Sequence, residues 1–195
     1  MAVKLTIARV LLFCVALVLS ACASIPLSSL PDLARIDFMT TDMEVLRVAL
    51  RMPEAIRPRP QGVVMDAVLT VQGVQTKTPF RLTPDDSGEP RPGLETAARP
   101  GMAVHVYRLA ASDTARFNAL RRDVLKAQAD GRRASLGLGI ETREFCSTGP
   151  VTEGALPAST FLLTSETGRF VLLVSDYDLR RNEATRPQLA TLDAC

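Results

Sequence analysis

The sequence is poor in the residues that most catalytic, metal-binding and nucleic-acid-binding sites require. It has one His, no Trp and only nine aromatic residues, seven Phe and two Tyr. A single His and four Cys leave little material for a transition-metal site, so we expect no metal and no cofactor. The dispersed aromatic residues provide no stacking surface for nucleic acid. P-loop, dinucleotide-binding and Gly-x-Ser-x-Gly motifs are also missing from the sequence.

Acidic residues are missing from the first 21 positions, which contain one long apolar run. Lys4 and Arg9 precede residues 10–19, all of which are apolar. Ten helical residues span about 15 Å, half of the ~30 Å hydrocarbon core of a bilayer. A charged start, a short apolar run and small residues after it are typical of a signal peptide rather than of a transmembrane helix.

The apolar run ends in Leu19-Ser20-Ala21-Cys22. This motif resembles the lipobox of bacterial lipoproteins. The resemblance implies that residues 1–21 are cleaved off and that Cys22 becomes the first residue, with diacylglycerol on its sulfur and an acyl chain such as palmitate on its amino group. Ala23 in place of Asp favours the outer membrane by the enterobacterial sorting rule. The alternatives are an ordinary secretory signal, since Ala21-Cys22-Ala23 fits the A-x-A pattern, and an uncleaved anchor.

The mature chain carries no net charge. Loss of Lys4 and Arg9 lowers Lys plus Arg from 23 to 21, which equals the 21 Asp and Glu. Global charge therefore gives no reason to expect nucleic acid or an anionic lipid surface as a partner. Only three basic residues are Lys, and clustered Arg can bind phosphate or carboxylate, although a compositional bias of the genome explains the Arg content more simply.

The cysteines agree with export. Cys14 lies in the predicted signal peptide and Cys22 in the lipobox, which leaves Cys146 and Cys195. An even pair in an exported domain predicts a disulfide, with two free thiols as the alternative.

Alternating apolar residues predict a strand-rich domain with one main helix. Residues 22–33 form a lipidated N-terminus and short tether, and residues 34–195 a single domain that faces the periplasm. Within residues 112–131, Ser112 is the expected N-cap, Gly131 ends the helix, and one face is apolar. Pro79 predicts an edge strand, and apolar residues on both faces predict that 169–175 is central. The expected strands are 46–52, 63–71, 76–82, 102–109, 135–142, 160–164 and 169–175.

The expected fold class is α+β, an antiparallel domain of about seven strands with one packed helix. A β-sandwich with an inserted helix is the alternative. Residues 83–101 are rich in Pro and Gly, which predicts a long exposed loop.

Three functions remain open. The first is a non-catalytic envelope lipoprotein that binds a partner protein or assists envelope assembly, and it predicts an exposed apolar or Arg-lined patch. The second is a carrier or sensor of a small apolar ligand such as lipid, which requires a cavity of a few hundred Å³. The third is a hydrolase of envelope polymers, whose candidate residues are His105, Asp176 and Asp178.

Overall fold

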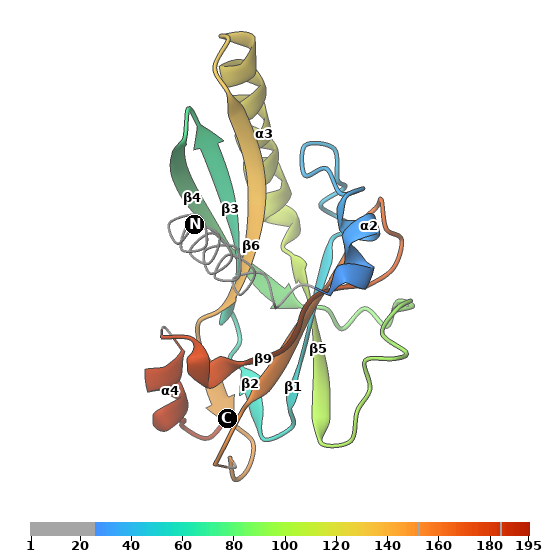
Figure 1. The fold of residues 1–195 in the computed structure, drawn as a ribbon, viewed down its shortest axis with the longest axis vertical. Helices are drawn as coiled ribbons and strands as arrows, with labels where there is room; N and C mark the ends of the chain where they lie inside the picture. Colours follow the sequence, from blue (N-terminus) through green and yellow to red (C-terminus); the bar gives the residue numbers. More distant parts are fainter. Residues whose placement is uncertain (1–25, 152, 184) are drawn as a thin grey trace, which may run out of the picture.

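The computed structural model describes residues 26–151, 153–183 and 185–195. The predicted signal peptide and Cys22 lie outside these residues. Two short helices begin the described chain, strands follow, and α3 is the main helix (Figure 1). The elements are η2 (Leu27–Ser29), α2 (Leu30–Leu33), β1 (Arg47–Pro53), β2 (Ile56–Pro58), β3 (Val63–Val71), β4 (Val74–Pro84), β5 (Met102–Leu109), α3 (Ala111–Ala129), β6 (Ala134–Thr142), β7 (Phe145–Ser147), β8 (Pro157–Leu163), β9 (Val171–Asp178), η3 (Leu179–Arg181) and α4 (Arg186–Ala190).

Seven strands form one curled antiparallel sheet in the order β6-β3-β4-β5-β1-β8-β9. The predicted α+β class, with seven strands and one main helix, is confirmed. A β-sandwich does not form, because the second sheet contains only β2 and β7. Within the described ranges, no helix has the length and apolar content that crossing a membrane requires.

The main core lies on one face of the curled sheet. Val48, Leu50 and Met52 of β1 alternate toward this face and are buried there, while Ala49 joins a smaller cluster on the opposite face. Helix α3 packs against β3 and β6 (Figure 1). Its Phe117 lies 5.7 Å from Phe80 of β4 between ring centroids. The apolar stripe of α3 is therefore part of the core.

The prediction that residues 169–175 form a central strand is wrong. They correspond to β9, which pairs with β8 alone and ends the sheet. Both of its faces are apolar because Leu173 packs against the main core and Leu172 against the smaller cluster. Apolar residues on both faces of a strand show that both faces are covered. They do not show how many strands pair with it.

Two further predictions are wrong, one about the N-cap of the main helix and one about the edge of the sheet. Helix α3 begins at Ala111 with Ala110 as its N-cap, and Ser112 does not cap it. Strand β4 lies inside the sheet order, although Pro79 has a partner only in β3, because β5 pairs with just Leu82–Pro84. The missing N–H of Pro79 thus leaves no hydrogen bond to β5 unmade.

The loop after β4 is less exposed than predicted. Asp85 is buried, and its Oδ2 accepts a hydrogen bond from Nε of Arg47 at 2.7 Å. Further along, Ala97 is buried, and the N–H of Phe170 donates to the carbonyl of Pro92 at 2.8 Å. The loop therefore packs across the face of the sheet that carries the smaller cluster.

Candidate functional site

A groove of about 660 Å³ lies on the core face of the sheet. Its walls come from both edge strands of the sheet, β6 and β9, and its floor from β1 and β8. The short helices η3 and α4 close one side. The residues that line it are Leu50, Met52, Ile140, Glu141, Thr142, Arg143, Ala158, Thr160, Val174, Tyr177, Leu179, Asn182, Thr185 and Gln188.

The groove exists because the sheet curls without closing. Strand β6 pairs with β3 only, and β9 with β8 only, so these two strands do not hydrogen bond to each other as barrel strands would. Alternation along β1 directs Leu50 and Met52 into the groove, and Ile140 enters from β6. The part of the floor that β1 supplies is therefore apolar because its alternating sequence places apolar side chains on this face.

A smaller apolar pocket of about 210 Å³ shares Ile140 with the groove. The N-terminal segment supplies one of its walls. Nε of Arg121, in α3, donates to the carbonyl of Phe38 at 2.8 Å and so holds that wall against the helix. The pocket is lined by Leu33, Ile36, Phe38, Leu138, Ile140, Leu162 and Leu173.

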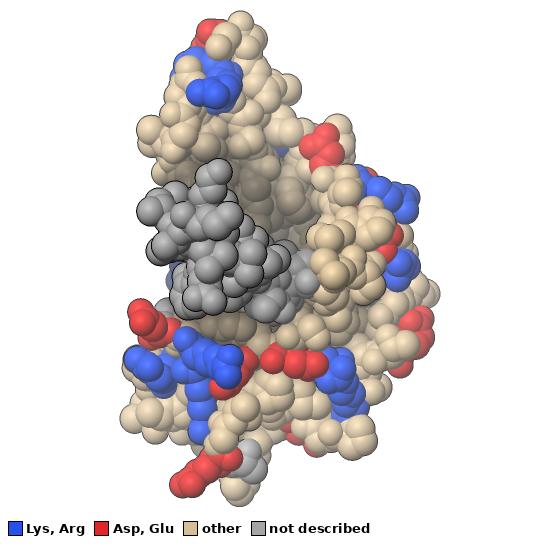
Figure 2. All heavy atoms as spheres, viewed as in Figure 1, with Lys and Arg blue, Asp and Glu red and all other residues tan. Residues whose placement is uncertain are grey.

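Charged groups lie along the β6 side of the groove. Arg143 donates from Nη2 to both carboxylate oxygens of buried Asp66, at 3.1 and 3.0 Å, and from Nε to Glu141 at 3.2 Å. These contacts fix the guanidinium at the groove while its charge stays partly exposed. Figure 2 shows a band of charged side chains across the lower half of one face, where Figure 1 places α4 and β9. The groove thus combines an apolar floor with a polar margin.

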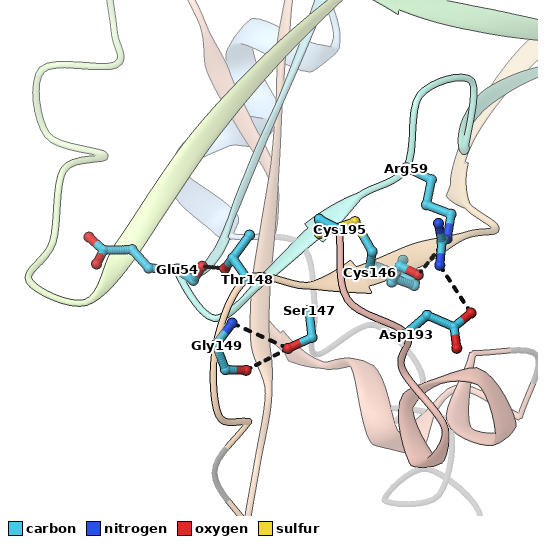
Figure 3. The surroundings of a disulfide bond; sticks show 9 residues. Glu54, Arg59, Cys146, Ser147, Thr148, Gly149, Asp193 and Cys195 are labelled. Atoms are coloured by element: carbon cyan, nitrogen blue, oxygen red, sulfur yellow. Dashed lines mark hydrogen bonds and ion pairs between the residues drawn. A yellow bond between two sulfur atoms is a disulfide. The ribbon is translucent and has the colours of Figure 1, made fainter.

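The C-terminal wall of the groove is attached to the small sheet. The sulfur atoms of Cys146, in β7, and Cys195 lie 2.11 Å apart, the distance of a disulfide, as the cysteine count predicted. The N–H of Cys195 donates to the carbonyl of Ser147 at 2.9 Å, and Arg59 pairs with Asp193 at 3.2 Å (Figure 3). These contacts anchor the chain just after α4, which lines the groove.

His105 and the two acids selected from the sequence do not share a cavity with one another. His105 lines a separate pocket of about 330 Å³ with Arg57, Asp85 and Asp86. Burial, and then the charge of Arg57, lowers the pKa of His105 below 6.5. Burial also raises the pKa of its neighbour Tyr107 to about 12.

Both acids take part in structural contacts. Oδ1 of Asp176 accepts hydrogen bonds from Arg51 at 2.9 Å and Arg99 at 3.0 Å. Asp178 accepts from the N–H groups of Leu156 and Arg180 at 3.0 and 3.1 Å, which lowers its pKa. Across the described residues, no three His, Cys, Asp or Glu side chains come together to hold a metal ion.

Comparison with protein-family models, with curated proteins and with solved structures finds no match.

Proposed function

We propose that the chain is a membrane-anchored envelope lipoprotein that binds a single-chain amphiphile in the groove between β6 and β9. The anchor is the lipid on Cys22, which holds the domain on the periplasmic side, at the outer membrane. The observation that carries the ligand proposal is the groove itself. Its volume of about 660 Å³ lies within the range of ligand sites, about 300–1,000 Å³.

The lining favours a ligand with two chemical ends. An apolar chain on Leu50, Ile140 and Val174 gains about 25 cal/mol for each Å² removed from water. The pocket that shares Ile140 extends the apolar surface toward Phe38. A polar headgroup finds Arg143 and Glu141 on the β6 side, where the Arg143 guanidinium is already held in place by Asp66. We therefore expect a fatty acid or a lysolipid rather than a compact polar metabolite.

A partner protein is the second candidate occupant, in line with the interaction role predicted from the sequence. Strands β6 and β9 end the sheet, and each has one edge without a partner strand among the described residues. An extended segment of another protein can add to such an edge through main-chain hydrogen bonds. Proteins that co-purify would support this candidate, whereas a non-covalent amphiphile would support the first.

Ligand binding is tested with the protein purified from membranes and a fluorescent fatty acid as the probe. We expect saturable binding to the native chain. Ile140→Arg should weaken it roughly tenfold or more, because a charge then enters the apolar wall that β6 gives to the groove. Val74→Arg is the matched control, since Val74 is 70% exposed and lies outside the groove. Val174→Gln adds a milder change, and circular dichroism checks that each variant is folded.

The groove proposal fails if the native chain binds no single-chain amphiphile, or if Val74→Arg weakens binding as much as Ile140→Arg does. The anchor has its own test. Cys22→Ser should lose the acyl chains by mass spectrometry and move from the membrane to the soluble periplasmic fraction. Unchanged membrane attachment of that variant would contradict lipidation at Cys22 without bearing on the groove.

A further inference from the structure

We propose that a second cavity, on the opposite face of the sheet, binds the phosphate headgroup of an anionic membrane lipid. This cavity has a volume of about 360 Å³. It is lined by residues that alternate with those of the groove side, such as Arg51 beside Leu50 and Met52, and Phe161 beside Leu162. The inference rests on the proposed anchor at Cys22 and is independent of the ligand in the groove.

Arg51 supplies the buried charge of this cavity. Its side chain is only 3% exposed. Nη2 donates to Ser159 at 2.7 Å and to Asp176 at 2.9 Å, but Nε is buried and has no hydrogen-bond partner among the described residues. A buried donor without an acceptor is costly, because it loses its hydrogen bond to water. Arg51 therefore lines the cavity with a buried guanidinium whose donors the protein does not fully satisfy.

The cavity carries more positive than negative charge. Arg51 and Arg99 share the single carboxylate of Asp176, and Arg169 pairs with Asp32. Three guanidinium groups and the carboxylate of Asp32 line the cavity, and the Asp176 carboxylate pairs with two of the three, which leaves one positive charge. Guanidinium groups bind phosphate oxygens through paired donors, so a phosphate matches this excess. Arg99 and Arg169 are about half exposed, so they remain accessible to a headgroup.

The position of the cavity favours a lipid as the source of the phosphate. Ser28 and Ser29, which line it, lie between Leu27 and Leu30, whose exposed fractions are 82% and 47%. Five residue steps separate Leu27 from Cys22, which limits their distance to about 17 Å. With Cys22 acylated, the two leucines lie close to the bilayer and can enter its interface. The Arg residues of the cavity would then meet the headgroup layer.

The test measures co-sedimentation of the Cys22→Ser chain with vesicles, so that lipidation cannot cause the binding. Vesicles contain phosphatidylcholine alone or phosphatidylcholine mixed with phosphatidylglycerol. We expect binding that depends on phosphatidylglycerol and falls roughly tenfold or more in an Arg99→Gln, Arg169→Gln double variant. The matched control is Arg122→Gln with Arg132→Gln, which removes the same charge from outside the cavity. Equal thermal unfolding midpoints show that the variants are folded.

Four results would overturn the inference. Binding that does not depend on phosphatidylglycerol would rule out recognition of an anionic headgroup. Equal losses of binding in both double variants would show that overall positive charge, and not the cavity, causes the binding. Inorganic phosphate that binds to the chain in solution, without preference for vesicles, would reassign the cavity to a free anion. An acidic protein that co-purifies through Arg99 and Arg169, with lipid binding unchanged, would assign the surface to a protein partner.

Discussion

At the scale of single residues, the sequence identified several side chains that matter but not their partners. From the sequence Asp176 is an acid near a strand end, and the structure pairs it with Arg51, 125 residues away, and Arg99, 77 residues away. Burial alone would raise the pKa of Asp176, but the hydrogen bond and charge of Arg99 and then those of Arg51 lower it. Such contacts depend on strand order, which no local pattern contains. The cysteine pair was predictable because only two thiols remained.

His105 gives a prediction at this scale. Its pKa is lowered by burial and by Arg57, and its Nε2 is buried without a partner among the described residues. Between the folded and unfolded pKa values, the unfolded chain binds more protons. The free energy of unfolding should therefore decrease as the pH falls through 6.5, by at most about 1.4 kcal/mol per pH unit. Above that pH the contribution is complete.

Urea unfolding between about pH 8 and pH 5 measures this dependence. His105→Gln should remove the part of the slope in this range, because glutamine does not titrate. The carboxylates with lowered pKa values, such as Asp85 and Asp176, titrate at lower pH. An unchanged slope in His105→Gln would show that another group causes it.

At the scale of elements, periodicity predicted the strands and the helix well, and their neighbours poorly. Alternation of residue type located β1, β3 and β5, although both faces of β1 and of the first half of β3 are buried. It placed β9 in the centre of the sheet, because an edge strand whose two faces are covered by other segments has the same sequence pattern as a central strand. Strands β2 and β7 went unpredicted since each has only three residues.

Substitutions in helix α3 test whether its apolar stripe packs in the core. Phe117 is fully buried against Phe80, so Phe117→Ala should lower the free energy of unfolding by about 3–5 kcal/mol. Leu125, on the same helix, is 56% exposed, and Leu125→Ala should change it by less than about 0.5 kcal/mol. Chemical denaturation of both variants measures the difference. Similar effects of the two changes would mean that α3 does not pack through this stripe in solution.

At the scale of the whole molecule, the groove and the smaller apolar pocket beside it depend on opposite ends of the described chain. The N-terminal segment that includes Phe38 forms part of the apolar pocket, and η3 with α4 forms one wall of the groove. From the sequence, the predicted tether ends at Leu33 and Phe38 lies in the predicted domain, and the local pattern indicates no cavity wall in either segment. Their roles come from long-range packing on the curled sheet, which the local pattern does not encode. The sequence therefore did not predict a cavity. The hypothesis of an apolar-ligand carrier only required one.

The disulfide should link stability to ligand binding at this scale. It closes 49 residues of chain and ties the segment after α4 to β7. Replacing Cys146 and Cys195 by Ser should lower the free energy of unfolding by about 2–4 kcal/mol. Residues 179–192 should then exchange amide hydrogens faster, and the fatty-acid probe should bind more weakly, because α4 supplies part of the groove wall.

Arg59→Gln is the matched control for the disulfide. It removes a second link to the same segment, the ion pair with Asp193, whose carboxylate is largely exposed. An exposed pair contributes less than about 1 kcal/mol, so stability and probe binding should stay close to those of the native chain. If the double Cys variant loses stability but keeps its affinity for the probe, the C-terminal wall does not shape the ligand site. If Arg59→Gln weakens probe binding as strongly as the double variant, loss of the covalent bond does not explain the effect. If the double Cys variant shows faster exchange only in residues 179–192 and also binds the probe more weakly, the disulfide is what holds α4 against the groove.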